Sequence, residues 1–185
     1  MLAVTVGYWL SSPAETLPII GHVHEFTLTN QLGAPVTRVS LADKVHVFNI
    51  IFSRCPTQCH ILSHQMAQVQ RGSPDGVALW SLTADPEYDT PAVLARYGAD
   101  HGANPAVWQF LTGPKREVYR FASADLLFSV MENANPKSTR LDELFIHSAD
   151  FVLVDRQGRL RAVVHGEEPH ADRKVLKYVR ALLRE

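Results

Sequence analysis

Residues 45–59 read VHVFNIIFSRCPTQC and place two cysteines just behind an apolar run. Residues 45–52 are rich in β-branched and aromatic side chains, which predicts a strand buried on both faces of a sheet. A helical pattern follows the second cysteine and continues to about Arg71. The stretch therefore predicts a strand, a short turn that carries Cys55 and Cys59, and a helix, in that order.

Strands and helices alternate on both sides of this unit. Asp89-Thr90-Pro91 has the features of a helix start, because a capping side chain precedes proline. The other expected elements are strands at residues 26–28, 77–83 and 107–111, helices at 91–100 and 114–121, a hairpin of residues 150–155 and 159–164, and an amphipathic helix from 171 to 182. This order predicts an α/β fold with a central mixed β-sheet flanked by helices, a C-terminal β-hairpin and a final helix.

Composition and charge fit a single globular domain. Of the 185 residues, 46% are hydrophobic and 20% are charged, and the net charge is −1. The chain therefore has no basic excess for binding nucleic acid or an anionic membrane surface. Residues 1–10 are apolar, but a spanning helix needs about 20 such residues and a signal peptide needs a positive start. We expect a leader, or the remnant of a membrane anchor, at residues 1–20 and one domain at residues 21–185.

The cysteine pair supports two chemistries. Unpaired backbone N–H groups at a helix start favour negative charge, so a thiolate there is expected to have a lowered pKa. Two residues four apart on a helical turn share a face and lie about 6 Å apart, which permits a disulfide or a shared metal ion. Soft thiolates suit Cu(I), zinc or an iron–sulfur cluster. Clusters and structural zinc need more ligands than Cys55 and Cys59 provide, whereas copper accepts a Cys, Cys, His set.

A third ligand is sought among the nine histidines. His60 and His64 share one helix face, about 100° from the cysteine face. Exposure on the helix surface is the favoured interpretation for both, and a zinc site of these two histidines with Cys55 and Cys59 is disfavoured because the faces diverge. His147 precedes the strand of the hairpin, which can return it to the cysteine end of the sheet. The residues alone do not select it over two later candidates, His165 and His170.

Two acidic residues have a structural and a functional interpretation. Asp85 precedes proline in a turn and Asp89 lies in the helix cap, which is the default interpretation. In the functional one, the two carboxylates lie near the metal, where they orient a ligand or dock a partner.

Several segments, in order, resemble the Sco/SenC family over roughly residues 24–165. They are residues 26–29 (FTLT), 48–59 (FNIIFSRCPTQC), 83–91 (TADPEYDTP), 108–113 (WQFLTG), and His147-Ser148 ahead of FVLVDRQGRL. The resemblance implies a thioredoxin-like fold that binds one copper ion, Cu(I) or Cu(II), through Cys55, Cys59 and His147. It implies a metallochaperone for the dinuclear copper centre of cytochrome c oxidase subunit II. In one departure, His60 stands where the family has proline after the second cysteine, which restores a backbone donor.

The resemblance also implies partners and a compartment. The partners are cytochrome c oxidase subunit II or a similar copper client, and another copper chaperone. The compartment is extracytoplasmic, with the bacterial periplasm favoured and an N-terminal anchor in the inner membrane as an option.

The metallochaperone is the favoured hypothesis, and two enzymatic functions stay open beside it. In a thiol–disulfide reductase, Cys55 attacks a client disulfide and Cys59 resolves the mixed disulfide, so that His147 is dispensable. A thiol peroxidase would use Arg54 to stabilise the bound peroxide, and nothing else in the sequence supports it.

Overall fold

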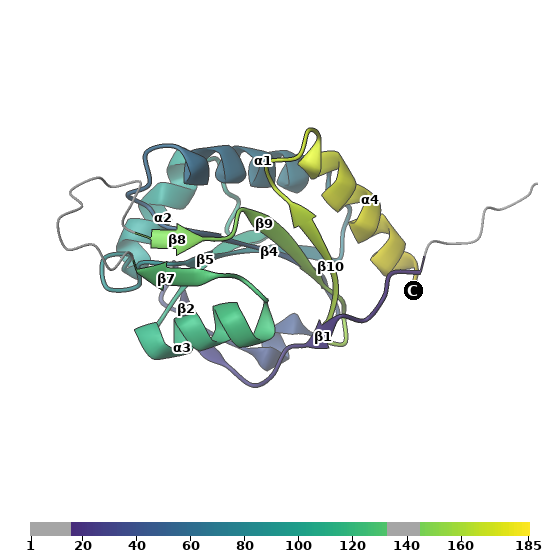
Figure 1. The fold of residues 1–185 in the computed structure, drawn as a ribbon, viewed down its shortest axis with the longest axis horizontal. Helices are drawn as coiled ribbons and strands as arrows, with labels where there is room; N and C mark the ends of the chain where they lie inside the picture. Colours follow the sequence, from purple (N-terminus) through teal and green to yellow (C-terminus); the bar gives the residue numbers. More distant parts are fainter. Residues whose placement is uncertain (1–15, 133–144) are drawn as a thin grey trace, which may run out of the picture.

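The computed structural model describes residues 16–132 and 145–185, and an eight-stranded mixed sheet forms its centre (Figure 1). The strands lie in the order β1-β10-β9-β4-β5-β6-β2-β3. Their bounds are β1 Gly21–His22, β2 Thr27–Asn30, β3 Pro35–Thr37, β4 Val45–Ile51, β5 Val77–Thr83, β6 Trp108–Thr112, β9 Asp150–Val154 and β10 Arg159–His165. A separate two-stranded ribbon pairs β7 (Val130–Glu132) with β8 (Phe145–His147).

The centre of the sheet is parallel and fully buried. β4 pairs with β5 from Val45↔Val77 to Ile51↔Thr83, and β5 pairs in parallel with β6. Every residue of β4 and β5 is buried, which confirms the predicted strand with two covered faces. β9 runs antiparallel to β4, and β10 antiparallel to β9, so the predicted hairpin closes this side of the sheet.

Helices cover both faces of the sheet, and Figure 1 shows α1 and α4 along one side and α3 along the other. The bounds are α1 Gln58–Gly72, α2 Pro91–Asp100, α3 Lys115–Arg120 and α4 Ala171–Arg184, with a short 3-10 helix at Arg38–Leu41. α1 packs against α4, and α2 packs against β6. The mixed sheet, the flanking helices, the hairpin and the final helix are therefore confirmed.

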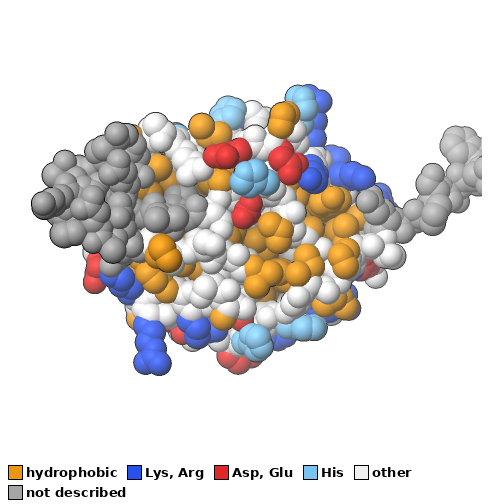
Figure 2. All heavy atoms as spheres, viewed as in Figure 1, with side chains coloured by type: hydrophobic (Ala, Val, Ile, Leu, Met, Phe, Trp, Pro, Cys, Tyr) orange, Lys and Arg blue, Asp and Glu red, His pale blue; other side chains and the backbone are white. Residues whose placement is uncertain are grey.

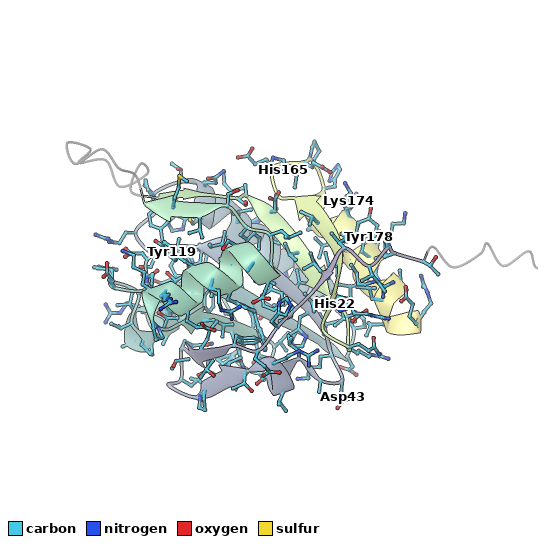
Figure 3. The ribbon with its side chains drawn as sticks, turned by 60° about the horizontal axis from the view of Figure 1, so that its bottom comes forward. His22, Asp43, Tyr119, His165, Lys174 and Tyr178 are labelled. Atoms are coloured by element: carbon cyan, nitrogen blue, oxygen red, sulfur yellow. The ribbon has the colours of Figure 1, made fainter. Side chains whose placement is uncertain are left out.

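The face under α3 is closed by aromatic packing. The Phe121 ring lies 4.3 Å from Phe26 and 5.9 Å from Phe48, measured between centroids. Tyr119, labelled on α3 in Figure 3, donates a hydrogen bond to the carbonyl of Ala84 over 3.0 Å. Since Ala84 directly follows β5, this bond ties α3 to the end of the sheet at which the cysteine turn begins.

The structure departs from the sequence predictions at several boundaries. The helix predicted at 114–121 continues past α3 as a π-helical segment, Phe121–Asp125, in which Phe121, Ala122 and Asp125 are buried. β2 begins one residue later than expected, and β1, β3 and the β7–β8 ribbon were not predicted. These short strands carry too few residues for an alternating pattern to reveal them.

The N-terminal part of the described chain runs beside β10. Ile20 N–H donates to the Leu160 carbonyl over 2.8 Å, and Val23 N–H donates to the Gly158 carbonyl over 2.9 Å. Figure 2 shows hydrophobic side chains gathered on the face drawn in Figure 1. Ile19 and Ile20 are among the large hydrophobic residues that stay exposed. The predicted leader, residues 1–20, lies mostly outside the described residues. In the ranges that are described, no helix combines the length and the apolar character that crossing a membrane requires.

Candidate functional site

The two cysteines lie in the turn between β4 and α1. After β4, Cys55 N–H donates to the Phe52 carbonyl over 3.1 Å, which closes a tight turn. α1 begins at Gln58, so Cys59 lies in its first turn and Cys55 lies ahead of the helix. Both are buried, and their exposed fractions are only 4% and 0%. The predicted strand, cysteine turn and helix are confirmed, although the two cysteines do not share one helical turn.

Backbone amides approach both sulfur atoms. Cys59 N–H donates to Cys55 Sγ over 3.4 Å, and Phe52 N–H donates to Cys59 Sγ over 3.4 Å. Both sulfur atoms therefore contact backbone N–H groups of the segment 52–59. These bonds also favour electron-rich sulfur, as in a thiolate or a metal-bound cysteine. The turn therefore holds the two sulfur atoms where they can interact with each other.

The pKa of Cys59 corrects one expectation. The hydrogen bond with the Cys55 side chain, then burial, then the electrostatic interaction with Cys55 raise the pKa of Cys59 well above that of an ordinary thiol. The sequence predicted a lowered pKa for a cysteine at a helix start, and for Cys59 the buried sulfur neighbour outweighs the helix. Cys59 thus keeps its proton at neutral pH, and this proton must leave when the pair binds a metal ion or forms a disulfide.

Asp89 holds the start of the cysteine turn. Its carboxylate accepts a hydrogen bond from Ser53 N–H over 3.1 Å, and it also accepts hydrogen bonds from the hydroxyls of Ser53 and Thr83. Asp89 is fully buried, and this burial raises its pKa even though the hydrogen bonds favour the charged form. The expected role as a helix cap belongs to Thr90, whose hydroxyl accepts from Val93 N–H. Asp89 instead links the end of β5 to the residues that lead to Cys55.

Asp85 fixes the next residue of the turn. One oxygen of its carboxylate lies 2.5 Å from an Arg54 terminal nitrogen and 3.1 Å from Arg54 Nε. The Arg54 guanidinium also stacks over the Tyr88 ring, 4.3 Å from its centroid. Arg54 directly precedes Cys55 in the chain, so this contact fixes the residue next to the cysteine. Both carboxylates thus hold residues that precede Cys55, and their role toward a metal ligand or a partner stays a prediction.

Tyr97 joins α2 to the first turns of α1. Its hydroxyl lies 2.9 Å from Ser63 Oγ and donates to the Cys59 carbonyl over 3.4 Å. Burial raises the pKa of Tyr97, so the phenol stays neutral and keeps its proton for these bonds. Sequence reasoning missed Ser53, Thr83 and Tyr97, because their roles depend on which elements lie side by side in the sheet.

The backbone after His147 approaches the same helix. His147 ends β8, where it lies opposite Val130. Two residues later, the Ala149 carbonyl accepts from Gly166 N–H over 2.6 Å, and a side chain at Gly166 would collide with Leu62 of α1. The His147 side chain lies outside what the structure describes, so its place in the predicted set with the two cysteines stays a prediction.

The remaining histidine candidates point elsewhere. His60 lies 3.1 Å from a ring nitrogen of His101, whereas His64 contacts Gln68 on its own helix. His165, labelled in Figure 3, pairs with Asp150 over 2.8 Å, and this hydrogen bond raises its pKa. His170 precedes α4 in a left-handed conformation.

The disfavoured four-ligand zinc site is not assembled. Across residues 16–132 and 145–185, as far as their side chains are described, no group of three or more His, Cys, Asp or Glu residues is placed to hold a metal ion. All four ligands of the disfavoured zinc site, which are the two cysteines, His60 and His64, lie within these described residues.

Comparison with known proteins gives consistent likenesses. A family model described as SCO1/SenC matches residues 18–184. The "SCO1 protein homolog" of Bacillus subtilis is 29% identical over 155 residues, which are 82% of this chain and 77% of that protein. BsSco, a protein with a disulfide switch and a member of the Sco family of cytochrome c oxidase assembly proteins, is 25% identical, with a TM-score of 0.71 over 91% of this chain and 98% of that one.

A copper-bound relative has the same architecture. The crystal structure of yeast Sco1 with copper bound is 26% identical, with a TM-score of 0.67 over 88% of this chain and 90% of that one. The residues that the family model matches include the sheet, the cysteine turn and the flanking helices. The structural likenesses confirm the predicted thioredoxin-like fold.

Proposed function

Because the chain belongs to the SCO1/SenC family, we propose that it is a metallochaperone that carries one copper ion for the assembly of cytochrome c oxidase. The ligands in this proposal are Cys55, Cys59 and His147, and the cargo is Cu(I) or Cu(II). The client is the dinuclear copper centre of subunit II. The observation that carries the proposal is the pair of buried cysteines held in one turn, each sulfur accepting a backbone N–H.

The donor set fits copper better than harder ions. Two sulfurs in an apolar site favour a soft metal, and copper needs fewer protein ligands than structural zinc. The burial of Cys59 excludes water from one side of the ion, and loss of its proton on metal binding makes uptake depend on pH. Asp89 and Asp85 hold Ser53 and Arg54 and so keep the turn in place during ligand exchange.

The test is copper titration of the fully reduced protein, followed by absorption spectroscopy and metal analysis. We expect one retained copper and, with Cu(II), a thiolate-to-copper charge-transfer band. Cys55→Ser should abolish the band, and His147→Ala should weaken binding and shift the band. His165→Ala, a histidine paired with Asp150, is the matched control and should bind as the wild type does. A reduced wild-type protein that retains no copper would contradict the proposal.

Thiol–disulfide reduction is the second candidate, favoured by the contact between the two buried cysteines. In this reaction the Cys55 thiolate attacks one sulfur of a client disulfide and releases the other as a thiolate. Cys59 loses its proton and attacks Cys55 Sγ, which frees the reduced client and leaves the Cys55–Cys59 disulfide. The disulfide switch described for BsSco is consistent with such a pair. His147→Ala should leave the rate of dithiol exchange unchanged, whereas Cys55→Ser should abolish it.

The proposed compartment is extracytoplasmic, with the bacterial periplasm favoured and anchoring to the inner membrane as an option. The proposed partners are subunit II or a similar copper client, and another copper chaperone that delivers the ion. Pull-down of the copper-loaded protein with the soluble domain of subunit II, with the Cys55→Ser variant as control, tests the partnership.

A further inference from the structure

Two histidines from different helices face each other on the surface beside the cysteine turn. His60 follows Cys59 in the first turn of α1, and His101 follows the last residue of α2. His60 Nδ1 lies 3.1 Å from His101 Nε2, and the two rings are stacked with centroids 5.2 Å apart. His60 is exposed and His101 is half-buried, so the facing nitrogens can be reached from solvent.

The His101 ring is held as the ring of a metal ligand is usually held. Its Nδ1 lies 2.8 Å from the Tyr97 carbonyl, which can only accept, so Nδ1 carries the proton. In the neutral ring the lone pair is then on Nε2, the atom that faces His60. A histidine ligand commonly donates its second N–H to a backbone carbonyl, which fixes the tautomer and the ring orientation. The Tyr97 ring, 4.3 Å from the His101 ring, packs against it and restricts it further.

The separation of the two nitrogens suits a shared metal ion. With metal–nitrogen bonds of about 2.0–2.1 Å, two ligands lie about 2.9 Å apart at a right angle and about 3.4 Å apart at the tetrahedral angle. The observed 3.1 Å lies between these values. In the metal-free protein His60 Nδ1–H donates to His101 Nε2. A metal ion takes the place of this hydrogen bond when His60 changes to the tautomer protonated at its other nitrogen and the exposed His60 ring turns, so that the two lone pairs converge on the ion beside the line between the nitrogens. Neither ring changes its charge.

We propose that His60 and His101 form a second metal site, at the surface, for a divalent transition-metal ion of borderline softness. Cu(II) binds most tightly and Zn(II) more weakly, following the general order of divalent affinities. Water completes the coordination. The site is distinct from the thiol pair in its donors and its exposure. Tyr97 contacts both sites, since its hydroxyl donates to the Cys59 carbonyl and its own carbonyl accepts from His101.

The experiment uses the Cys55→Ser/Cys59→Ser variant, which removes the thiol ligands and leaves the histidines. Titration with Cu(II) is followed by calorimetry and by electron paramagnetic resonance, which reports nitrogen ligation. We expect one tight Cu(II) with nitrogen hyperfine structure. His60→Gln or His101→Gln, each added to this cysteine-free variant, should weaken the affinity for Cu(II) about tenfold or more. Loss of a residue that only orients a metal ligand already has an effect of this size. Far-UV circular dichroism checks that each variant is folded.

His64→Gln is the matched control, because His64 is an exposed histidine of the same helix whose contact is with Gln68. It should leave the affinity for Cu(II) unchanged. Equal affinity in the variants with and without His60 and His101, or equal weakening by His64→Gln, would overturn the proposal. Since His60 is exposed, His60→Gln tests the site even if His101→Gln fails to fold.

The two copper proposals fail independently. In protein with both cysteines intact, His101→Gln should keep the thiolate-to-copper band of the buried pair. If the wild type shows no thiolate-to-copper band while the cysteine-free variant binds nitrogen-ligated Cu(II), the metallochaperone proposal is contradicted and the surface site is supported. The reverse pattern contradicts the surface site alone.

Discussion

Acidification is expected to destabilise this protein through His46, a fully buried histidine in β4. Its ring packs against Trp80, with centroids 4.4 Å apart, and its Nδ1 lies 3.2 Å from the Lys44 carbonyl. Its Nε2 has no hydrogen-bond partner among the described residues. Burial is the main cause that lowers the pKa of His46 from 6.5 to about 4, and the charge of Lys44 adds to it.

The magnitude follows from linkage. Above pH 6.5 His46 is neutral in the folded and the unfolded protein and has no effect. Between pH 6.5 and about 4 only the unfolded state binds the proton, so the free energy of unfolding falls as the pH falls. Below about pH 4 both states are protonated and the effect is complete. At about 1.4 kcal/mol per pH unit the full loss is about 3 kcal/mol, a large part of a typical stability of about 5–15 kcal/mol.

The assay is urea denaturation at steps from pH 7 to pH 4, for the wild type, His46→Leu and His22→Gln. His46→Leu keeps an apolar side chain beside Trp80 and removes the titrating group. Between pH 7 and pH 4 its free energy of unfolding should therefore fall by about 3 kcal/mol less than that of the wild type. His22, labelled in Figure 3, is exposed, and the variant should follow the wild type. Other titrating groups affect both proteins equally, so their contributions cancel in the difference between the two free energies of unfolding. Parallel curves for the wild type and His46→Leu would refute the reasoning.

Two further predictions concern the support of the cysteine turn. Asp89→Ala leaves the half-buried Ser53 donors and the buried Thr83 hydroxyl unpaired, so urea denaturation should show a loss of about 2–4 kcal/mol in the free energy of unfolding. Thiol labelling should become faster, and an unchanged labelling rate would contradict the role of Asp89 in holding the cysteine turn. Gly166→Ala puts a methyl group against Leu62 and a backbone carbonyl, and should destabilise by about 1–3 kcal/mol and weaken copper binding. Unchanged stability would show that the loop can move aside.

The local part of the site could be predicted from the sequence. The apolar run of β4, the helical pattern of α1 and the proline at the start of α2 each act through neighbours in the chain, and the structure confirms all three. The position of Cys55 and Cys59 between strand and helix follows from the same local signals. Such signals need only the periodicity of the side chains and the chemistry of helix starts.

The long-range part could not be predicted, because it depends on how α2 lies against α1. His60 was expected to be exposed on its helix, and the structure places it against His101, 41 residues away. The expected cap at Asp89-Thr90 is made by Thr90, and Asp89 also holds Ser53 across 36 residues, which the sequence did not reveal. The pKa of Cys59 was expected to fall and is raised, since burial and the Cys55 sulfur are set by the tertiary fold.

One segment supports the whole cysteine turn. Residues 85–101, from the end of β5 through α2, contact residues 53–60 along their length. The pairs include Asp85 with Arg54, Asp89 with Ser53, Tyr97 with Cys59, and His101 with His60. These contacts join the residues on both sides of the cysteine pair to one segment of the chain. A backbone shift in the cysteine turn would therefore have to break some of them or move α2 with it.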